Sequence, residues 1–317
     1  MKERPPVSPH TVIARAGKRG RALARRLGRL LGRQTTESPP VPLPPLDPRP
    51  GLSVVLGTLD RKPLLQAAIE SVRRETRNFP SEIIVIDGGS RDGSIEWLTA
   101  QPDIVTIVQH NRVERDGRKA IRRSWGSFIN LGFRTARADA VLMISDDCLL
   151  LPGSVAAGLA QLRQDGAEPV GGVAFYFRDW PLDADYYVQL TLGGTLMVNH
   201  GLFSRAALAA VDGAEEERYR FYKADGDLSI RITRAGFRIV DCPQAVVEHY
   251  LDPDEALRID NNATLEHDRA VYLARWRDEL GPRLTEGMGR KTIAFRDPQK
   301  LAEQVFGPIA AARRGAA

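Results

Sequence analysis

The sequence predicts an α/β fold built on a parallel, doubly wound sheet. Two observations carry this prediction. From Gly51 onward, short apolar runs typical of buried strands alternate with segments whose apolar residues recur at helical spacing. In addition, the apolar run 141–144 ends abruptly, and two carboxylates, Asp146 and Asp147, follow after one serine. A strand buried on both faces has no place for two charges, so we expect Asp146 and Asp147 to lie at its carboxyl end, facing the crevice where open α/β sheets bind ligands.

The first half of the folded region gives its elements in regular order. Residues 52–59 predict a strand, and 62–74 predict a helix with an apolar face. Further strands are expected at 82–90, 104–110 and 141–145, separated by helices at 94–100 and 124–137. Because strands and helices alternate, the crossover connections should be right-handed.

The second half is less regular. Strands are expected at 171–177 and 193–203, and a late strand with a turn at 238–249. The predicted helices lie at 226–235, at 262–280, where one face is polar, and from Pro298 to the C-terminal region.

The net charge of +5 is located in the first 50 residues. They hold 11 Lys and Arg against 3 Asp and Glu, whereas the remaining 267 residues hold 34 against 37. The body shows no basic stripe interleaved with aromatic residues, so we expect no nucleic-acid partner. Two cysteines, Cys148 and Cys242, are too few for a disulfide framework or a structural zinc site. With no apolar run near the ~20 residues that span a bilayer, and no signal-peptide pattern, a cytoplasmic protein is expected.

Residues 11–33 have the pattern of a basic amphipathic helix, with leucines at helical spacing and arginines on the other faces. Such a helix would make peripheral contact with an anionic membrane, here the inner face of the cell membrane. Four glycines in the segment favour the alternative, a solvated and partly disordered tail. Seven of the twelve residues 39–50 are proline, which predicts an extended linker ahead of a folded region that begins near Gly51.

Asp146 and Asp147 are the first candidates for chemistry. Hard carboxylate oxygens are the ligands that Mg²⁺ or Mn²⁺ takes when it must also hold a substrate's phosphates. The alternative is a surface turn in which one of these side chains caps the following helix.

Two other carboxylates follow predicted strands, Asp60 after the first and Asp87 after the second. Because the carboxyl ends of parallel strands lie at one rim, these side chains should converge with Asp147 and could bind a ribose hydroxyl or a base edge. The glycine-rich turn after Asp87 would let the backbone approach a ligand closely. Asp-Gly and Gly-Ser are also ordinary turn pairs, so this motif has a purely structural interpretation as well.

The second half adds five further candidate residues. Asp225 and Asp227 flank a glycine at the start of a predicted helix; Asp227 is placed to cap that helix, which leaves Asp225 as the candidate general base. His249, at the end of the late strand, is either a metal ligand or a hydrogen-bonded strand-end histidine. Gly193 and Gly194 precede an apolar segment, where their backbone would approach a bound sugar.

A dense basic cluster follows the third predicted strand and comprises Arg115, Arg118, Lys119, Arg122 and Arg123. Opposite a carboxylate-lined pocket it could hold a pyrophosphate. A solvated helix start is the equally simple alternative.

The order of these motifs resembles the family 2 glycosyltransferases, which have the GT-A fold. Five segments between residues 52 and 249 carry the resemblance in the order of the family: LSVVLGTLDRKPLLQAAIESV, EIIVIDGGSRDGSIEWL, NLGFRTARADAVLMISDDCLLLPGSV, GGTLMVNHGLF and ADGDLSIRITRAGFRIVDCPQAVVEH. The resemblance implies a Rossmann-like, doubly wound mixed sheet. It also implies transfer of a sugar from a nucleotide-sugar donor, usually with inversion and with a divalent cation.

The resemblance assigns roles position by position. Thr58, Asp60 and Asp87 would bind the nucleoside, Asp147 would be the metal-binding acid of the DXD motif, and Asp225 would be the base. We group Asp146, Gly193 and Gly194 with the nucleotide-sugar-binding residues, and His249 with the metal ligands. Asp227 is the second choice for the base.

Two positions depart from the family pattern. Ser145 stands where the first acid of the DXD motif is expected, although Asp146 could compensate, and Ala224 replaces the glutamate that usually precedes the base. The change at Ser145 puts the expected metal affinity in doubt, and the change at Ala224 puts the assignment of the base in doubt. They also make a rival reading worth testing, in which a catalytically degraded GT-A-like module binds nucleotide-sugars without turnover.

The resulting hypothesis is a cytoplasmic GT-A glycosyltransferase of the hexosyltransferase type that requires Mg²⁺ or Mn²⁺. Its acceptor would be a glycan, a polysaccharide or a lipid-linked molecule, as in cell-envelope polysaccharide biosynthesis. We expect four regions: a basic tail and linker at 1–50, a nucleotide-binding half at 51–150, an acceptor- and sugar-binding half at 151–255, and a C-terminal helical extension at 256–317.

Overall fold

The computed structural model describes residues 51–317 except 112–113, 116–117, 120–122, 252–254, 298 and 317. The predicted basic helix at 11–33 and the proline-rich linker therefore lie outside the described residues, and so does Arg122 of the basic cluster after the third strand. The backbone of Arg115, Arg118 and Lys119 is described, but their side chains are not. Membrane contact through residues 11–33 stays a prediction. Within the described part of the chain, no helix combines the length and the apolar character needed to cross a membrane.

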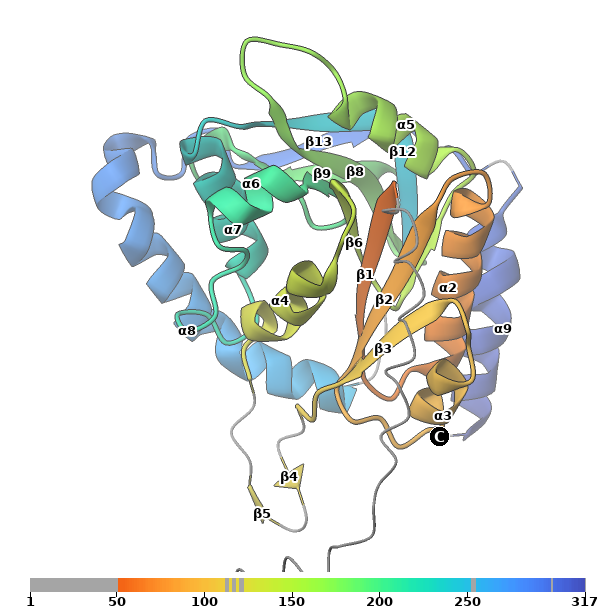
Figure 1. Cartoon of the computed structure of the whole chain (residues 1–317). Coiled ribbons are helices and arrows are strands. Elements are labelled where there is room, and N and C mark those ends of the chain that lie inside the picture. Colours follow the sequence, from red (N-terminus) through yellow and green to blue (C-terminus); the bar gives the residue numbers. More distant parts are fainter. Residues whose placement is uncertain are drawn as a thin grey trace, which may run out of the picture. The chain divides into compact units, whose positions relative to one another are not determined.

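Four parallel strands form one half of the main sheet, as predicted. They are β1 (Leu52–Thr58), β2 (Ser81–Asp87), β3 (Ile104–Val108) and β6 (Ala140–Ser145), and they lie in the order β3-β2-β1-β6. The register places Thr58 beside Asp87 and Gly57 beside Ser145, so these strands end at one rim. In Figure 1 this rim faces the bottom of the view, where the small hairpin of β4 (Glu114–Arg115) and β5 (Arg118–Lys119) also lies.

The other half makes the sheet mixed, as the resemblance implied. Strand β11 (Gly201–Ser204) runs antiparallel between β6 and β8 (Val170–Trp180), and β9 (Tyr186–Leu190) follows β8. The long strand β12 (Arg238–Tyr250) runs parallel to β8 and antiparallel to β7 (Cys148–Leu150). Strands β10 (Leu196–Met197) and β13 (Gly289–Ile293) both pair with β9.

Helices cover both faces of the sheet (Figure 1). Apolar residues of α2 (Lys62–Thr76), α3 (Ser94–Thr99) and α5 (Ser154–Leu162) share one core with the sheet. The opposite face is covered by α4 (Trp125–Thr135), α6 (Arg205–Ala210) and α7 (Ala224–Arg234). Pro63 in the first turn of α2 and Ser124 as N-cap of α4 fix where these two helices begin.

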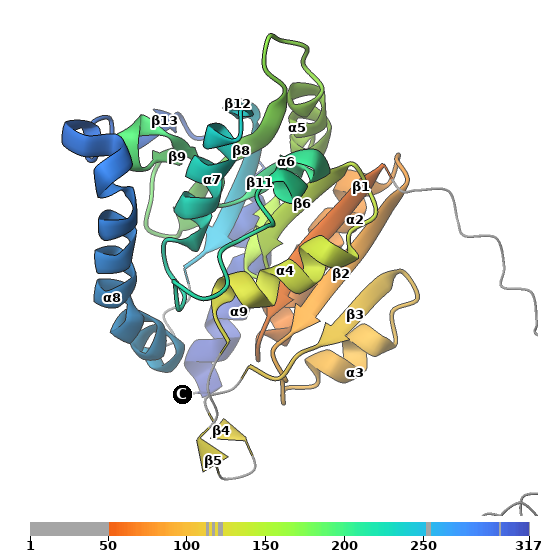
Figure 2. The same ribbon diagram turned by 60° about the vertical axis from the view of Figure 1, so that its left-hand side comes forward.

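The two C-terminal helices are integral to the fold. Helix α8 (Glu255–Leu280) runs beside α7 in both views, and its residues Tyr272 and Trp276 are buried with Ala224 and Ile230 of α7 (Figures 1 and 2). Helix α9 (Leu301–Ala316) packs its buried Phe306 against residues of α2, β7 and β12.

One predicted strand is wrong. Residues 193–203 do not form a continuous strand; Leu192–Gly194 is a 3₁₀ turn, followed by the separate strands β10 and β11. The reason is local, because Gly193 and Gly194 have φ angles of 63° and 69°, in the left-handed region that a strand excludes. The sequence interpretation also missed β7, α5, β9, α6 and β13.

The packing of α8 on α7 gives a prediction for Gly226. A Cβ added to Gly226 would lie 2.7 Å from the Tyr272 hydroxyl oxygen and 3.2 Å from Met197 Sδ. We therefore expect Gly226→Ala to lower the free energy of unfolding in urea by about 1–3 kcal/mol, the usual cost of overpacking. Gly307→Ala is the matched control, since a Cβ at this helical glycine meets nothing within 4 Å. Equal stability of the two variants would contradict the close approach of α8 to α7.

Candidate active site

The carboxyl rim of the parallel strands brings together four of the predicted site residues. Thr58 and Asp87 are neighbours in register at the ends of β1 and β2. Asp146 and Asp147 follow β6, and the Thr58 hydroxyl donates a hydrogen bond of 2.7 Å to Asp146 Oδ2. The convergence expected from a parallel sheet is therefore present, and all four side chains are buried.

Arg61 links the two adjacent acids. Its Nη1 lies 3.2 Å from Asp146 Oδ1 and 2.6 Å from Asp147 Oδ2. Burial raises the pKa of Asp146; Arg61 opposes this shift and the neighbouring Asp147 carboxylate adds to it. Burial would also raise the pKa of Asp147, but the charges of His249 and Arg61 outweigh it and hold that pKa well below its usual range. Asp147 is therefore the firmly ionised member of the pair.

His249 faces Asp147 across a short gap. Its Nε2 lies 3.5 Å from Asp147 Oδ1, while its Nδ1 lies 2.7 Å from Asp179 Oδ1. Burial lowers the pKa of His249, but the two carboxylates dominate and raise it to about 10. The neighbouring His200 is buried beside His249 and Cys148; burial and the charge of His249 lower its pKa to about 3.

Asp87 carries an unsatisfied oxygen in the same region. Its Oδ1 accepts hydrogen bonds of 2.7 Å from the backbone amides of Gly89 and Ser90, whereas Oδ2 is buried and has no partner in the described part of the chain. A buried carboxylate oxygen without a donor is costly, so this atom is a strong candidate to accept a hydrogen bond from a ligand.

Asp60 holds the turn after β1. Its φ angle is 53°, its amide donates to Ser90 Oγ, and its Oδ1 accepts from the Arg91 amide. Asp60 therefore ties the turn after β1 to the turn after β2. Its predicted contact with a nucleoside stays a prediction.

Asp225 lies in the first turn of α7, and its Oδ2 accepts a hydrogen bond of 2.8 Å from Asn199 Nδ2. Burial raises the pKa of this carboxyl, against the hydrogen bonds from Gly226 and Asn199 and the charge of Lys223. The other Asn199 atom, Oδ1, is buried without a partner among the described residues. Since His200 follows Asn199 directly, the chain connects the Asp225 side of the site to the His249 side.

The predicted capping role of Asp227 is wrong. The N-cap of α7 is Lys223, which makes no side-chain capping bond, and Asp227 lies four residues farther on. The Asp227 carboxylate is fully buried, 2.7 Å from Arg231 Nε and 2.8 Å from Arg275 Nε of α8. Tyr219 Oη and Trp276 Nε1 also donate to it. Sequence reasoning missed this role because Arg275 and Trp276 are distant in the chain.

Gly193 and Gly194 face the C-terminal segment. A Cβ on Gly193 would lie 3.2 Å from Leu280, and the Gly193 amide donates to the Leu284 carbonyl oxygen. A Cβ on Gly194 would lie 3.6 Å from Gly287. Their predicted contact with a bound sugar stays a prediction.

Sequence reasoning also missed three residues that contact the predicted ones: Arg61, Asp179 and Asn199. Arg61 follows β1 in the same turn as Asp60, so its position in the sequence could have predicted that it lies at the rim. Asp179 gave a weaker signal as an acid near the end of β8. Asn199 gave none, because its segment was interpreted as a regular strand.

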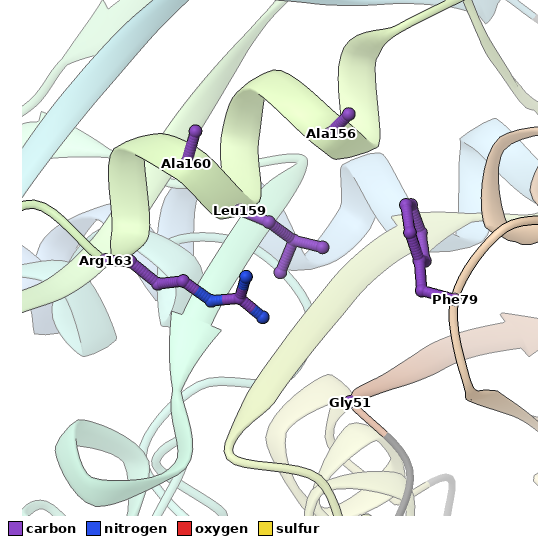
Figure 3. Close-up of a pocket in the computed structure, with 6 residues that line it drawn as sticks. All are labelled: Gly51, Phe79, Ala156, Leu159, Ala160 and Arg163. Atoms are coloured by element: carbon purple, nitrogen blue, oxygen red, sulfur yellow. The ribbon is translucent and has the colours of Figure 1, made fainter.

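A separate pocket of about 260 Å³ lies at the opposite edge of the sheet. It is lined by Gly51, just before β1, by Phe79, and by Ala156, Leu159, Ala160 and Arg163 on or next to α5 (Figure 3). Because ligands of open α/β sheets bind at the carboxyl ends of the strands, this pocket does not belong to the candidate active site.

The comparisons with known proteins agree with this geometry. Residues 53–189 match the family model described as glycosyl transferase family 2. The matched residues make up somewhat less than half of the chain. A mannosyltransferase from Pyrobaculum calidifontis, solved in complex with GDP-Man and Mn²⁺, is similar in structure to this chain, with a TM-score of 0.51 and 19% identity over 71% of this chain and 64% of that one. At this identity the likeness concerns the fold, and it confirms the predicted GT-A architecture.

Two curated relatives are similar to this chain in sequence. Chondroitin synthase of Pasteurella multocida is 27% identical over 209 residues, which are 62% of this chain and 20% of that protein. The uncharacterized protein y4gI of Sinorhizobium fredii is 25% identical over 280 residues, 75% of this chain and 30% of its own length. The chain thus spans less than a third of either relative.

Proposed function

We propose that this chain transfers a sugar from a nucleotide-sugar donor to an acceptor hydroxyl, with inversion and with Mg²⁺ or Mn²⁺. The observation that carries the proposal is the convergence of Thr58, Asp87, Asp146 and Asp147 at one rim of a family 2 fold. A glycan, polysaccharide or lipid-linked acceptor, and a role in cell-envelope polysaccharide synthesis, are part of the same proposal.

The nucleoside would lie at the ends of β1 and β2. Asp87 Oδ2 is the buried acceptor that a donor group of the base would satisfy. Thr58 and Asp60 flank that position, and Asp60 keeps the two turns together.

Asp147 and His249 would hold the divalent cation. The described residues contain no group of three or more His, Cys, Asp or Glu side chains arranged for a metal. Two protein ligands still suit Mg²⁺ or Mn²⁺, because these ions are commonly bound by one or two side chains together with substrate phosphates and water. The pair fits: His249 Nε2 faces Asp147 Oδ1 at 3.5 Å, and Asp179 on Nδ1 fixes the ring as outer carboxylates do in metal sites. When bound, the ion would neutralise charge on the leaving diphosphate.

Asp225 would act as the general base. Its carboxylate would take the proton of the acceptor hydroxyl while that oxygen forms a bond to the anomeric carbon. The bond from this carbon to the diphosphate oxygen breaks on the opposite face, which gives inversion. Asn199 orients Asp225 by donating to Oδ2, and the Gly226 amide donates to Oδ1.

A binding module without turnover is the second candidate, favoured by Ser145 and Ala224. Both lie next to proposed functional residues, and Ala224 is fully buried, so no side chain at position 224 supplies a second acid. Slow, metal-dependent hydrolysis of the donor distinguishes the two candidates, because only an active transferase passes the sugar to water.

The metal assignment gives a direct test. In the wild type, UDP or GDP with Mn²⁺ should raise the melting temperature, since a ligand at 100 times its Kd adds about 2.7 kcal/mol. Asp147→Asn should remove the Mn²⁺-dependent part of this shift, because it removes the charged ligand while keeping its shape. Asp139→Asn is the control, since Asp139 is an exposed acid paired with Arg205. An unchanged Mn²⁺-dependent shift in Asp147→Asn would refute the assignment.

A further inference from the structure

Arg61 contacts the Asp147 carboxylate that the proposed cation site would use, through Oδ2, while Oδ1 faces His249. Its Nη1 is 2.6 Å from Asp147 Oδ2 and 3.2 Å from Asp146 Oδ1, and its side chain is only 20% exposed. The two carboxylates are almost fully buried, so without a metal this guanidinium is the cation that lies directly against both of them.

The backbone around Arg61 is held on both sides. Asp60 before it has a left-handed φ of 53° and is tied to Arg91, and the Lys62 amide donates to Asp92 Oδ2 at 2.7 Å. The Arg61 carbonyl accepts from the Leu65 amide at the start of α2. Because the backbone is fixed, a change in the contacts of the guanidinium requires only side-chain rotation.

A divalent cation between Asp147 Oδ1 and His249 would lie close to the Arg61 guanidinium on Oδ2 of the same carboxylate. The two positive groups would compete for the negative charge of one carboxylate and repel each other at short range. The displaced guanidinium would remain at the rim where the donor diphosphate is proposed to lie. Guanidinium groups bind phosphate oxygens through paired, charge-assisted hydrogen bonds.

We propose that Arg61 is an exchangeable cation: it holds Asp146 and Asp147 while the site is empty and turns to the donor diphosphate when the divalent cation takes Asp147. This inference rests on the proposed function. It has a specific consequence, because Arg61 then opposes binding of the cation alone and favours binding of cation and nucleotide together. The two ligands should therefore bind with positive cooperativity.

The test uses Arg61→Gln, which keeps donor groups and removes the charge. Binding of Mn²⁺ alone is measured by the loss of the free-ion signal in electron paramagnetic resonance, and binding of UDP and GDP in saturating Mn²⁺ by calorimetry. The expected effects have opposite signs: Mn²⁺ alone binds at least ~5-fold more tightly, and the nucleotide that the wild type binds is held ~10-fold more weakly. Arg73→Gln is the control, since Arg73 pairs with Glu70 and Asp103 on the exposed face of α2.

A second variant, Arg61→Lys, keeps the charge but loses the paired donors. It should bind Mn²⁺ alone like the wild type and the nucleotide more weakly, and it supplies the answer if Arg61→Gln does not fold. Parallel losses of both ligands, or no change in either, would overturn the inference while leaving the proposed function intact. A wild type that binds neither nucleotide with Mn²⁺ would overturn the proposed function itself, and the inference with it.

Discussion

Asp225→Asn is expected to reduce sugar transfer by at least ~10²-fold and to leave the donor Kd within a few-fold of the wild type. The variant keeps the shape of the side chain and loses its capacity to take a proton. Asp225 contacts Asn199 and the Gly226 amide, not the acids of the nucleotide side, so donor binding should be preserved. The measurement is paired: the donor Kd by calorimetry and the transfer rate with a glycan acceptor.

The pH dependence of the wild type supplies a second readout of Asp225. Burial raises the pKa of this carboxyl, and only the ionised form can act as a base. Transfer should therefore be lost as the pH falls through a pKa above the usual aspartate range, and Asp225→Asn should lack this limb in its residual activity. A variant with full transfer activity would remove Asp225 from the mechanism.

Asp227→Asn is expected to cost about 3–5 kcal/mol of folding free energy. Its carboxylate is fully buried between Arg231 and Arg275, and the neutral amide would leave both guanidinium groups without their shared anion. The loss should appear as a lower midpoint in urea unfolding. The expected loss of folding free energy exceeds the ~1 kcal/mol that a lost helix cap costs. Its size therefore distinguishes the observed role of Asp227, a buried partner of two arginines, from the predicted role as a helix cap.

Asp225→Asn is the matched control for Asp227→Asn, since it makes the same substitution two residues away in the same helical turn. Its stability should stay close to that of the wild type. If instead Asp227→Asn folded with full stability and lost transfer while Asp225→Asn remained active, the two roles would be reversed.

The parallel half of the fold was predictable because its signals are local. The strands β1, β2, β3 and β6 are mostly apolar, and most of their polar residues lie at the ends. The rim that unites Thr58, Asp87 and Asp147 follows from strand direction alone. No such rule orders the second half, where β7 has three residues and β10 has two, and where pairing depends on distant partners.

The errors at Asp227 and at residues 193–203 have related causes. Asp227 matches a capping pattern in sequence, but partners on α8 decide its role. The apolar residues after Gly194 resemble a strand, but two left-handed glycines turn the chain toward the C-terminal segment. In both cases contacts with residues beyond 270 outweighed a correct local pattern.

The contact between α7 and α8 lies outside the segment that matches the family model, and this has a consequence for the exchange of segments between relatives. The family model ends at residue 189, so it includes Thr58, Asp87 and Asp147 but neither Asp225 nor the helix that holds it. A chimera that took residues 53–189 from a relative would inherit that relative's nucleotide-side acids and keep this chain's base, together with Asp227, Arg275 and Trp276. Under the proposed roles, the nucleotide-side acids and the base would come from separate stretches of sequence, while His249 would still have to meet Asp147 of the exchanged segment.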